Sequence, residues 1–478
     1  MNDEISELKE ELEYRQKDVA FATRRKGQSR YTLLREGTPR KILIHGSPFL
    51  ITMNKADKLE VLTDQSILIE DGIITKVMKA SELSQVDLAD IDLIYDAEQR
   101  GGIVVTPGLV NAHSHPPMYL LRSTLTFSEN NLEKTLKGMA RLENKMTEDD
   151  FFLSAVGDFT EQQKSGITTT LSHYGVFEPI DKAAKITGHE VINALSAVSN
   201  SHPENTPALV EKYLKNASKY HTQPAMAIHY LAKASPAVLK KLAVLQKKYK
   251  ALFTLHLAET KELTERSIKK FGEHPIKTLD RFGLLNPRTL MSHVIHVGRE
   301  EVALIVKRKA GVVHLPTSNL LHRSGHFDYP LFHKLKATGQ IALGTDSVVS
   351  KNRLDLLTEA FQTKTMHQHK KIVSYSDLFN MITAQGARLL GLTKVGKLAE
   401  GYRADIAFWK LKDRGFLPYN SKDPKTLVSN MITYGGRSAR DLMVNGSFVI
   451  SNRTHNYINE SKLLLQLQQA HMDLRKRI

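Results

Sequence analysis

The chain contains no cysteine among its 478 residues. Disulfide bonds, thiolate nucleophiles and thiolate metal ligands are therefore excluded, and any metal must be held by His, Asp or Glu. The sequence also lacks an apolar run of the roughly 18 residues that a membrane-spanning helix needs. Its N-terminus, MNDEISELKEELEYRQKD, is charged and has no apolar signal core. We therefore expect a cytoplasmic protein with no membrane partner.

The formal net charge of +16 raises the question of a nucleic-acid partner. The basic residues are spread widely, as in VLKKLAVLQKKYK at residues 238–250, where apolar residues recur at helical spacing and lysines fill the outer face. This pattern indicates a solvated helix face. Because the sequence also contains no DNA- or RNA-binding motif, we expect no nucleic-acid partner. Attraction of an anionic small molecule stays open.

Strand and helix patterns divide the chain into segments. Residues 1–40 carry apolar residues at helical intervals and predict an appended helix that docks on the protein body or on another subunit, with disorder as the alternative. Short strands occupy residues 41–104 and return at 395–455, and each segment has a hairpin signal, in EDGII and MVNGSF. We expect these two segments to form one small composite β-sandwich, followed by a C-terminal helix at residues 456–478.

The middle segment, residues 105–394, alternates apolar strand-like runs with helical ones. Eight strand-like runs occur in this order: GIVVTPGLVNAH, GITTTLSHYG, EVINALSAV, AMAIHYL, LFTLHLAE, TLMSHVI, GVVHLP and QIALGTDS. Near-continuous apolar runs are typical of strands buried on both faces of a parallel sheet. The pattern predicts an α/β fold with a (β/α)8 TIM barrel, whose chemistry lies at the C-terminal ends of the strands.

Polar residues recur where these runs end. The first run ends in His113 and His115, and strand alternation places both rings on the same side. Later runs end in further polar residues: His256, Glu259, His293, His296 and Asp346. A lone histidine at a strand end is more often a hydrogen-bonded core residue, but buried charge is costly unless it is paired or metal-bound. The combination indicates one shared ion, with zinc preferred and ferrous iron second for three imidazoles and a carboxylate.

The sequence resembles the amidohydrolase superfamily. PGLVNAHSH, HLAE, SHVIH, HLPTSN and LGTDS stand in the order of the signature blocks of that superfamily. GKLAEGYRADIAFW and MVNGSFV resemble its composite β-sandwich, so the resemblance covers roughly residues 41–450. It is strongest to the chlorohydrolase-like branch, which includes S-adenosylhomocysteine deaminase, guanine deaminase and the triazine hydrolases.

The resemblance implies a single divalent metal held by four residues, namely His113, His115, His256 and Asp346. The fourth strand, AMAIHYL, has no lysine at its end to carry a carbamate bridge. That absence favours one metal over two.

Catalytic roles also follow from the resemblance. Asp346 would touch the metal and accept a proton from the water, and Glu259 would shuttle a proton to a ring nitrogen of the substrate. His293 would polarise or orient the nucleophile. The resemblance assigns this role to His293, the first histidine of the motif, and not to His296. We expect His296 to begin a helix or to support the site from behind.

The resemblance says less about the substrate. PPMYLLRST resembles a run of the adenosine-type deaminases, and ARLENKMT resembles their helix with a ribose-binding glutamate, here Glu143. His173, His229 and Asn319 are further candidates for substrate contacts, and His314 is expected to support the site. Two departures put adenosine or S-adenosylhomocysteine in doubt: HYLAKASP replaces a PHSPY-like segment, and LSAVSN lacks the usual arginine.

We therefore expect a hydrolase acting on carbon–nitrogen bonds, a metal-dependent deaminase of a purine- or nucleoside-like N-heterocycle. Metal-bound hydroxide would attack an amidine-like ring carbon, and ammonia would leave. The alternatives within the fold are hydrolysis of another C–N or C–Cl bond, as in triazine hydrolases, and ring opening of a cyclic amide, as in imidazolonepropionase. A binding protein on an inactive barrel would have lost a ligand or Glu259, and none is lost. The expected partner is a small-molecule substrate. A homo-oligomer is also expected, because relatives in this branch are often dimers or larger.

Overall fold

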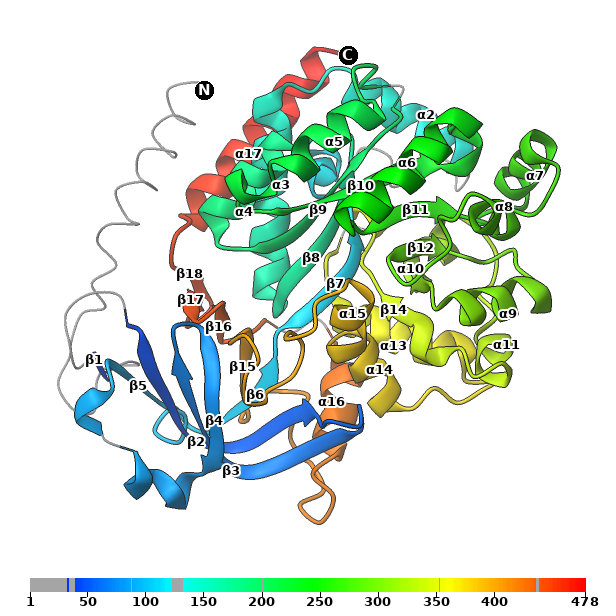
Figure 1. Cartoon of the computed structure of the whole chain (residues 1–478). Coiled ribbons are helices and arrows are strands. Elements are labelled where there is room, and N and C mark those ends of the chain that lie inside the picture. Colours follow the sequence, from blue (N-terminus) through cyan, green and yellow to red (C-terminus); the bar gives the residue numbers. More distant parts are fainter. Residues whose placement is uncertain are drawn as a thin grey trace.

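The computed structural model describes residues 32–33, 39–86, 88–122, 132–199, 201–351, 353–435 and 438–478. The helix predicted within residues 1–40 therefore lies almost entirely outside the described residues. The described chain forms two sheets, an eight-stranded parallel barrel sheet and a separate ten-stranded mixed sheet (Figure 1). No helix in the described part of the chain combines the length and apolar character that crossing a membrane requires.

Neighbouring strands of the barrel sheet are consecutive in the chain. Its strands are β7 (Leu109–Ser114), β8 (Ile167–Tyr174), β9 (Glu190–Ser196), β10 (Gln223–Tyr230), β11 (Phe253–Leu257), β12 (Thr289–His293), β13 (Gly311–His314) and β14 (Ile341–Leu343). An isolated parallel bridge between Ser114 and Asp346 joins the last strand's end to the first strand. The predicted TIM-barrel fold class is confirmed, and the carboxyl ends of all eight strands meet at one face.

Helices alternate with these strands and cover the outside of the barrel (Figure 1). They include α3 (Glu148–Lys164), α4 (Glu178–Thr187), α5 (Pro207–Lys215), α6 (Pro236–Tyr249), α7 (Lys261–Phe271), α8 (Pro275–Arg281), α9 (Arg299–Arg308) and α13 (Leu356–His367). In α6 the Ser235 hydroxyl caps the first turn, and Leu239, Leu242 and Leu245 face the core. Its lysines lie on the solvent side, as the sequence predicted.

The mixed sheet joins the two ends of the chain. Its strands are β1 (Thr32–Leu33), β2 (Lys41–Met53), β3 (Leu59–Glu70), β4 (Ile73–Lys79), β5 (Leu93–Asp96), β6 (Ile103–Pro107), β15 (Ile406–Lys410), β16 (Asp441–Val444), β17 (Ser447–Ser451) and β18 (Thr454–His455). Strand β6 pairs antiparallel with β15. The two predicted hairpin turns also meet, since a Cβ on Gly446 would lie 2.5 Å from the Cα atom of Gly72.

The run interpreted as the first barrel strand is divided between the two sheets. Strand β6 pairs with β2 and β15 in the mixed sheet, whereas β7 begins the barrel. Gly108 stands between them, and a Cβ there would lie 2.2 Å from the Thr168 Oγ1 atom. Both strands are fully buried, so hydrophobicity gives no sign of the division. The boundary expected between residues 104 and 105 falls inside β6.

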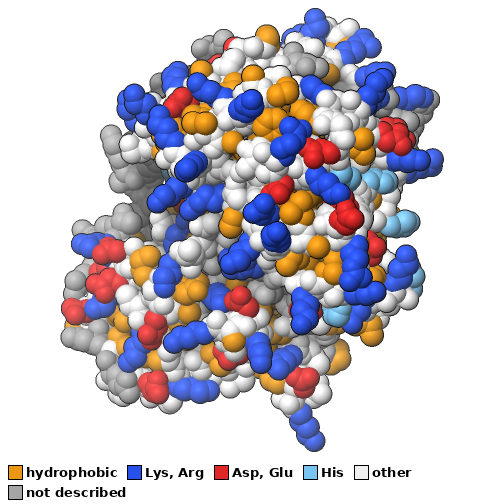
Figure 2. All heavy atoms as spheres, turned by 45° about the vertical axis from the view of Figure 1, so that its right-hand side comes forward, with side chains coloured by type: hydrophobic (Ala, Val, Ile, Leu, Met, Phe, Trp, Pro, Cys, Tyr) orange, Lys and Arg blue, Asp and Glu red, His pale blue; other side chains and the backbone are white. Residues whose placement is uncertain are grey.

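The described chain ends in helix α17 (Glu460–Lys476), which packs along α3 (Figure 1). Leu463, Leu467 and Leu474 lie on the buried face of α17. Figure 2 shows Lys and Arg side chains scattered over one face of the molecule with Asp and Glu among them. On that face the positive charge is dispersed.

Candidate active site

Three imidazole rings converge at the carboxyl end of the barrel. His113 and His115 come from β7 and its end, and His256 comes from β11. The Nε2 atom of His113 lies 3.1 Å from that of His115 and 3.2 Å from that of His256. The remaining pair, His115 and His256, is 3.3 Å apart at the same atoms. All three side chains are buried.

The opposite nitrogen of two rings faces a backbone carbonyl. His115 Nδ1 donates to the carbonyl oxygen of His173 at 2.6 Å, and His256 Nδ1 donates to that of His229 at 3.0 Å. A carbonyl oxygen only accepts, so the ring proton lies on Nδ1 and the Nε2 atom carries a lone pair. Such contacts are the usual means by which proteins orient metal-binding imidazoles.

His113 completes the same pattern. Its Nδ1 atom lies 3.0 Å from the Ser292 hydroxyl oxygen, which can accept the ring proton. Burial lowers the pKa of all three imidazoles, so the rings are neutral near pH 7. Three Nε2 lone pairs within hydrogen-bond distance, with no proton between them, repel each other unless a cation lies at their centre.

Asp346 brings a carboxylate to this cluster. It follows β14, and its Oδ1 atom lies 3.4 Å from His115 Nε2. Burial alone would raise the pKa of Asp346, but the neighbouring imidazoles outweigh burial and lower the pKa below its ordinary value. Three imidazole nitrogens and one carboxylate oxygen are a donor set that fits a divalent metal. His113, His115 and Asp346 form one possible ligand group, and His113, His173 and His256 form a second.

The strand ends around this cluster carry unusual backbone angles. Ala258, His293, Val294 and Asp346 all have positive φ values, between 48° and 72°, although none is glycine. Such angles cost of order 1–3 kcal/mol each and persist where surrounding structure enforces them. They turn the chain sharply at the ends of β11, β12 and β14.

Glu259 lies beside the imidazole cluster, and only 2% of its surface is exposed. The Tyr230 hydroxyl donates to its Oε2 atom at 2.9 Å. The Nε2 atom of His293 lies 3.6 Å from the same oxygen, and the Nδ1 atom of His293 lies 2.8 Å from the amide oxygen of Asn319. Burial and the Glu259 charge raise the pKa of Tyr230, which keeps the phenol protonated as a donor. The Glu259 carboxylate is therefore held in a fixed position beside the imidazole cluster.

A cavity of about 210 Å³ opens beside these residues. His173 and His229 line it at the ends of β8 and β10, and Glu143 lines it from the end of α2 (Leu132–Glu143). The Tyr174 hydroxyl donates to Glu143, whose pKa is raised by burial. The apolar part of the wall consists of Met118, Leu136, Met139, Ala140, Val198 and Leu263. The cavity thus combines an apolar wall with a half-buried carboxylate.

Three other histidine and asparagine predictions have different surroundings. Asn319 contacts His293 and is not among the residues that line this cavity. His296 donates from Nε2 to the Ser324 carbonyl oxygen at 2.8 Å. His314 packs against Phe327, with ring centroids 4.5 Å apart. All three are placed to support neighbouring structure.

Sequence reasoning did not identify several residues of the site: Tyr230, Ser292, Lys233 and Arg266. Tyr230 ends a barrel strand, and that position alone could have suggested it. Ser292 immediately precedes His293 and appeared only as a buried strand residue. Lys233 and Arg266 lie on separate elements and carry no sequence signal.

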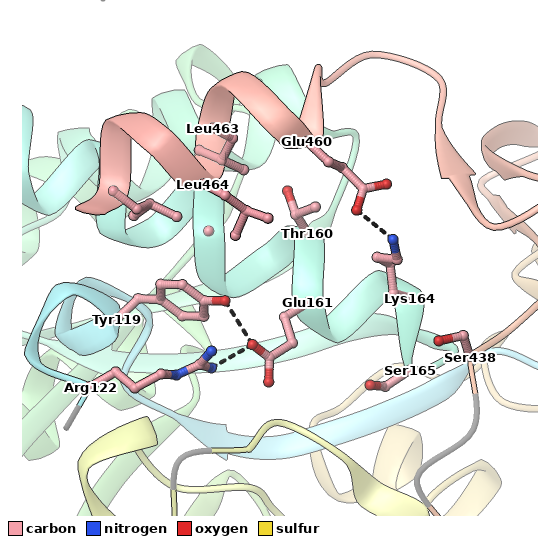
Figure 3. Close-up of a pocket in the computed structure, with 12 residues that line it drawn as sticks. Tyr119, Arg122, Thr160, Glu161, Lys164, Ser165, Ser438, Glu460, Leu463 and Leu464 are labelled. Carbon is pink, nitrogen blue, oxygen red and sulfur yellow. Dashed lines mark hydrogen bonds and ion pairs between the residues drawn. The ribbon is translucent and has the colours of Figure 1, made fainter. Parts of the chain in front are cut away.

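A second cavity, of about 320 Å³, lies between η3 (Pro116–Leu121), α3 and α17 (Figure 3). Glu161 accepts a hydrogen bond from the Tyr119 hydroxyl at 2.7 Å and another from the Arg122 guanidinium. Lys164 forms an ion pair with Glu460 of α17. The Lys164–Glu460 pair links α17 to α3, whereas the contacts of Glu161 link α3 to Tyr119 and Arg122.

The chain is similar in sequence to a known protein family and to named proteins over most of its length. The model of the amidohydrolase family matches residues 104–449. The chain is 30% identical over 434 residues to a Pyrococcus furiosus protein named 5-methylthioadenosine/S-adenosylhomocysteine deaminase, covering 88% of this chain and 97% of that one.

Solved structures give the same fold. An adenosine deaminase from Xanthomonas campestris with bound zinc has a TM-score of 0.81 and 21% identity, covering 91% of this chain and 98% of that one. The atrazine chlorohydrolase TrzN from Arthrobacter aurescens TC1, complexed with zinc, has a TM-score of 0.79 and 21% identity, covering 90% and 100%. At this identity the likeness is one of fold.

Proposed function

The chain belongs to the amidohydrolase family, and from this premise we propose that it is a metal-dependent hydrolase that deaminates a purine- or nucleoside-like N-heterocycle. The observation that carries the proposal is the convergence of three unprotonated imidazole nitrogens on one point, beside two buried carboxylates. One carboxylate completes a metal donor set, and the other is hydrogen-bonded in a position suited to proton transfer. The name of the Pyrococcus furiosus relative supports a nucleoside substrate.

We assign the metal to His113, His115, His256 and Asp346, with zinc as first choice and ferrous iron as second. Zinc in two of the similar structures supports the first choice. When bound, the metal acts as a Lewis acid that lowers the pKa of water and so makes it nucleophilic near neutral pH.

The remaining steps belong to side chains of this chain. Asp346 accepts the proton that the attacking water loses. Glu259 delivers a proton to the ring nitrogen next to the attacked carbon, and Tyr230 holds it in that position. His293, fixed by Asn319, orients the nucleophile. The proton taken up by Asp346 then passes to the amino group, the carbon–nitrogen bond breaks and ammonia leaves. The new hydroxyl loses its proton to Glu259 as the carbonyl forms, which restores both carboxyl groups.

The cavity residues are proposed to hold the substrate. Glu143 presents a carboxylate that can accept hydrogen bonds from sugar hydroxyls, with the Tyr174 hydroxyl on one of its oxygens. His173 and His229 lie nearest to the metal ligands on the cavity wall. The apolar side chains exclude water from the ring, which strengthens each polar contact.

The direct test is a deamination screen over purines, pterins, nucleosides and triazines, read by ammonia release from metal-loaded protein. We expect ammonia from at least one purine or nucleoside and about one metal per chain by elemental analysis, as a single mononuclear site requires. Metal-loaded protein that releases no ammonia from any member of the panel would refute the proposal.

A second candidate is hydrolysis of a different leaving group from a triazine, or ring opening of a cyclic amide. It is favoured by the likeness of fold to a chlorohydrolase and by LSAVSN, which lacks the arginine that the resemblance to nucleoside deaminases leads us to expect there. Release of chloride or of an alkylamine, without ammonia, would select it.

The proposed partners are small molecules in the cytoplasm. The dispersed basic side chains in Figure 2 favour a small-molecule partner over nucleic acid. We also propose a homo-oligomer, which sedimentation analysis tests directly.

A further inference from the structure

The first and last strands of the barrel meet with little backbone pairing. Each neighbouring pair from β7 round to β14 is paired at three or more positions, whereas within the described chain the ends of β14 and β7 share one isolated bridge, between Ser114 and Asp346. We call this junction the barrel seam. The proposed metal ligands lie on both sides of it, with His113 and His115 at β7 and Asp346 after β14. The fit across the seam therefore sets how closely Asp346 approaches the two histidines.

The side chain of Asn111 crosses the barrel seam. Its amide oxygen accepts a hydrogen bond from the Thr345 N–H at 3.0 Å, and its amide nitrogen donates to the Thr345 hydroxyl at 2.7 Å. Thr345 immediately precedes Asp346, and its hydroxyl donates to the Asp346 carbonyl oxygen at 3.3 Å. Asn111 is fully buried on β7, two residues before His113. One buried amide thus ties the backbone beside one proposed ligand to the strand that carries another.

Gln162 fixes this amide from outside the barrel. It is fully buried on α3, and its amide oxygen accepts hydrogen bonds from Asn111 at 2.9 Å and from the Thr170 hydroxyl of β8 at 2.7 Å. Its amide nitrogen donates to the Asp158 carboxyl group and, at 3.4 Å, to the Ser114 hydroxyl. A side-chain amide has two hydrogens to donate and two lone pairs that accept. Gln162 uses all four, so the orientation of its amide is set.

We propose that Gln162 is a positioning residue for the metal centre. It fixes Asn111, and Asn111 fixes the backbone at Thr345 beside the proposed metal-binding carboxylate. The inference rests on the proposed function, because it takes the assigned ligands as given. Without the Gln162 oxygen, one hydrogen of the Asn111 amide is buried without a partner, which is costly, and the amide is no longer held against Thr345. Helix α3 thus acts on the site although none of its residues lines the cavity.

The test compares two neighbouring, equally buried glutamines of α3. Gln163 follows Gln162, but its amide contacts the Thr187 carbonyl oxygen and the His455 ring, at 2.9 Å each, instead of the barrel strands. Gln162→Met and Gln163→Met each remove the amide and keep the side-chain length. We expect Gln162→Met to weaken zinc binding, measured by competition with a chelator, by about tenfold or more, as loss of the groups that orient metal ligands does. Gln163→Met should keep the native zinc affinity, although denaturant unfolding of the metal-free protein should show a loss of stability in both variants.

A second pair of variants follows the route through Thr345 and decides the matter if Gln162→Met does not fold. Thr345→Val keeps the shape of the side chain and removes the hydroxyl to which Asn111 donates, whereas Thr345→Ser keeps the hydroxyl and removes the methyl group. Thr345→Val should therefore weaken zinc binding, and Thr345→Ser should bind zinc with near-native affinity. A role in packing alone gives the opposite order, because Val fills the same space as Thr. Zinc affinity in Thr345→Val that equals or exceeds that in Thr345→Ser would overturn the inference.

Hydrogen exchange separates this inference from the proposed function, because it needs neither metal nor substrate. The backbone N–H groups of Thr345 and Asp346 donate across the seam to the Asn111 side chain and to the β7 backbone. In metal-free protein these amides should exchange faster in Gln162→Met than in Gln163→Met or the native chain. Such a result supports the inference even if the native protein releases no ammonia, in which case only the proposed function fails. Native exchange rates or native zinc affinity in Gln162→Met, or an equal loss of affinity in Gln163→Met, overturns the inference even where deamination is observed.

Discussion

Replacing Glu259 by Gln removes one proton carrier while keeping the size of the side chain. The residue is buried, and its contact with the Tyr230 hydroxyl at 2.9 Å can be kept by the amide oxygen of Gln. The fold and the proposed metal ligands should therefore be preserved. Loss of general acid–base catalysis lowers rates by ~10²–10⁴-fold. At about 1.4 kcal/mol for each tenfold change, the barrier should rise by about 3–6 kcal/mol.

The assay is ammonia release under saturating substrate, with metal content measured on the same sample. Glu262→Gln is the matched control, because it makes the same substitution three residues later at an exposed position in the first turn of α7. We expect kcat to fall only in the Glu259 variant, with metal content unchanged in both. Normal turnover by metal-loaded Glu259→Gln would refute the proton-transfer role.

Three further predictions concern the metal, pH and packing. His256→Ala should lose metal to a level well below stoichiometric, because it removes one of three converging nitrogens; elemental analysis after dialysis measures this. Burial raises the pKa of Asp158 to about 8. The pKa of Asp158 is therefore higher in the folded than in the unfolded protein, so its contribution to stability is full below about pH 4 and is lost as the pH rises through 8. The Asp158→Asn variant should show a thermal unfolding temperature that depends less on pH between these values. Gly344→Ala would place a Cβ 2.9 Å from the His113 backbone and should destabilise the protein by about 1–3 kcal/mol in denaturant unfolding.

Each of these has a result that counts against it. Full metal content in His256→Ala would remove that ligand from the assignment. An Asp158→Asn variant whose unfolding temperature varies with pH as strongly as that of the native protein would show that another group controls the dependence. Native stability in Gly344→Ala would mean that the backbone of His113 can yield without cost.

Most of the barrel could be predicted from the sequence, because strands buried on both faces become continuous apolar runs. The same property concealed the division at Gly108, where a strand of one sheet continues directly into a strand of the other. Nothing in hydrophobicity marks that change, and the close approach of Thr168, which leaves room only for a glycine at position 108, is visible only in the folded structure.

The candidate site was predictable to a similar degree. The sequence alone identifies the histidines at strand ends as neighbours, since every barrel strand ends at the same face. The contacts that orient them come from backbone carbonyls, such as those of His173 and His229, and no residue type encodes these. The approach of Lys233 and Arg266 depends on how a 3-10 turn packs against a helix, which spacing along the chain does not give.

The joining of both chain ends in one sheet has a consequence for how the protein folds. Val105 pairs with Phe408, so this contact must close a loop that contains the entire barrel. Closing long loops is slow and costs chain entropy before it yields stabilising contacts. During synthesis the edge of β6 waits unpaired until β15 emerges, and an unpaired edge is a template for aggregation. The contact of the Gly72 and Gly446 turns can thus form only after both segments of the sheet have been synthesised, so the mixed sheet is completed after the whole barrel sequence has emerged.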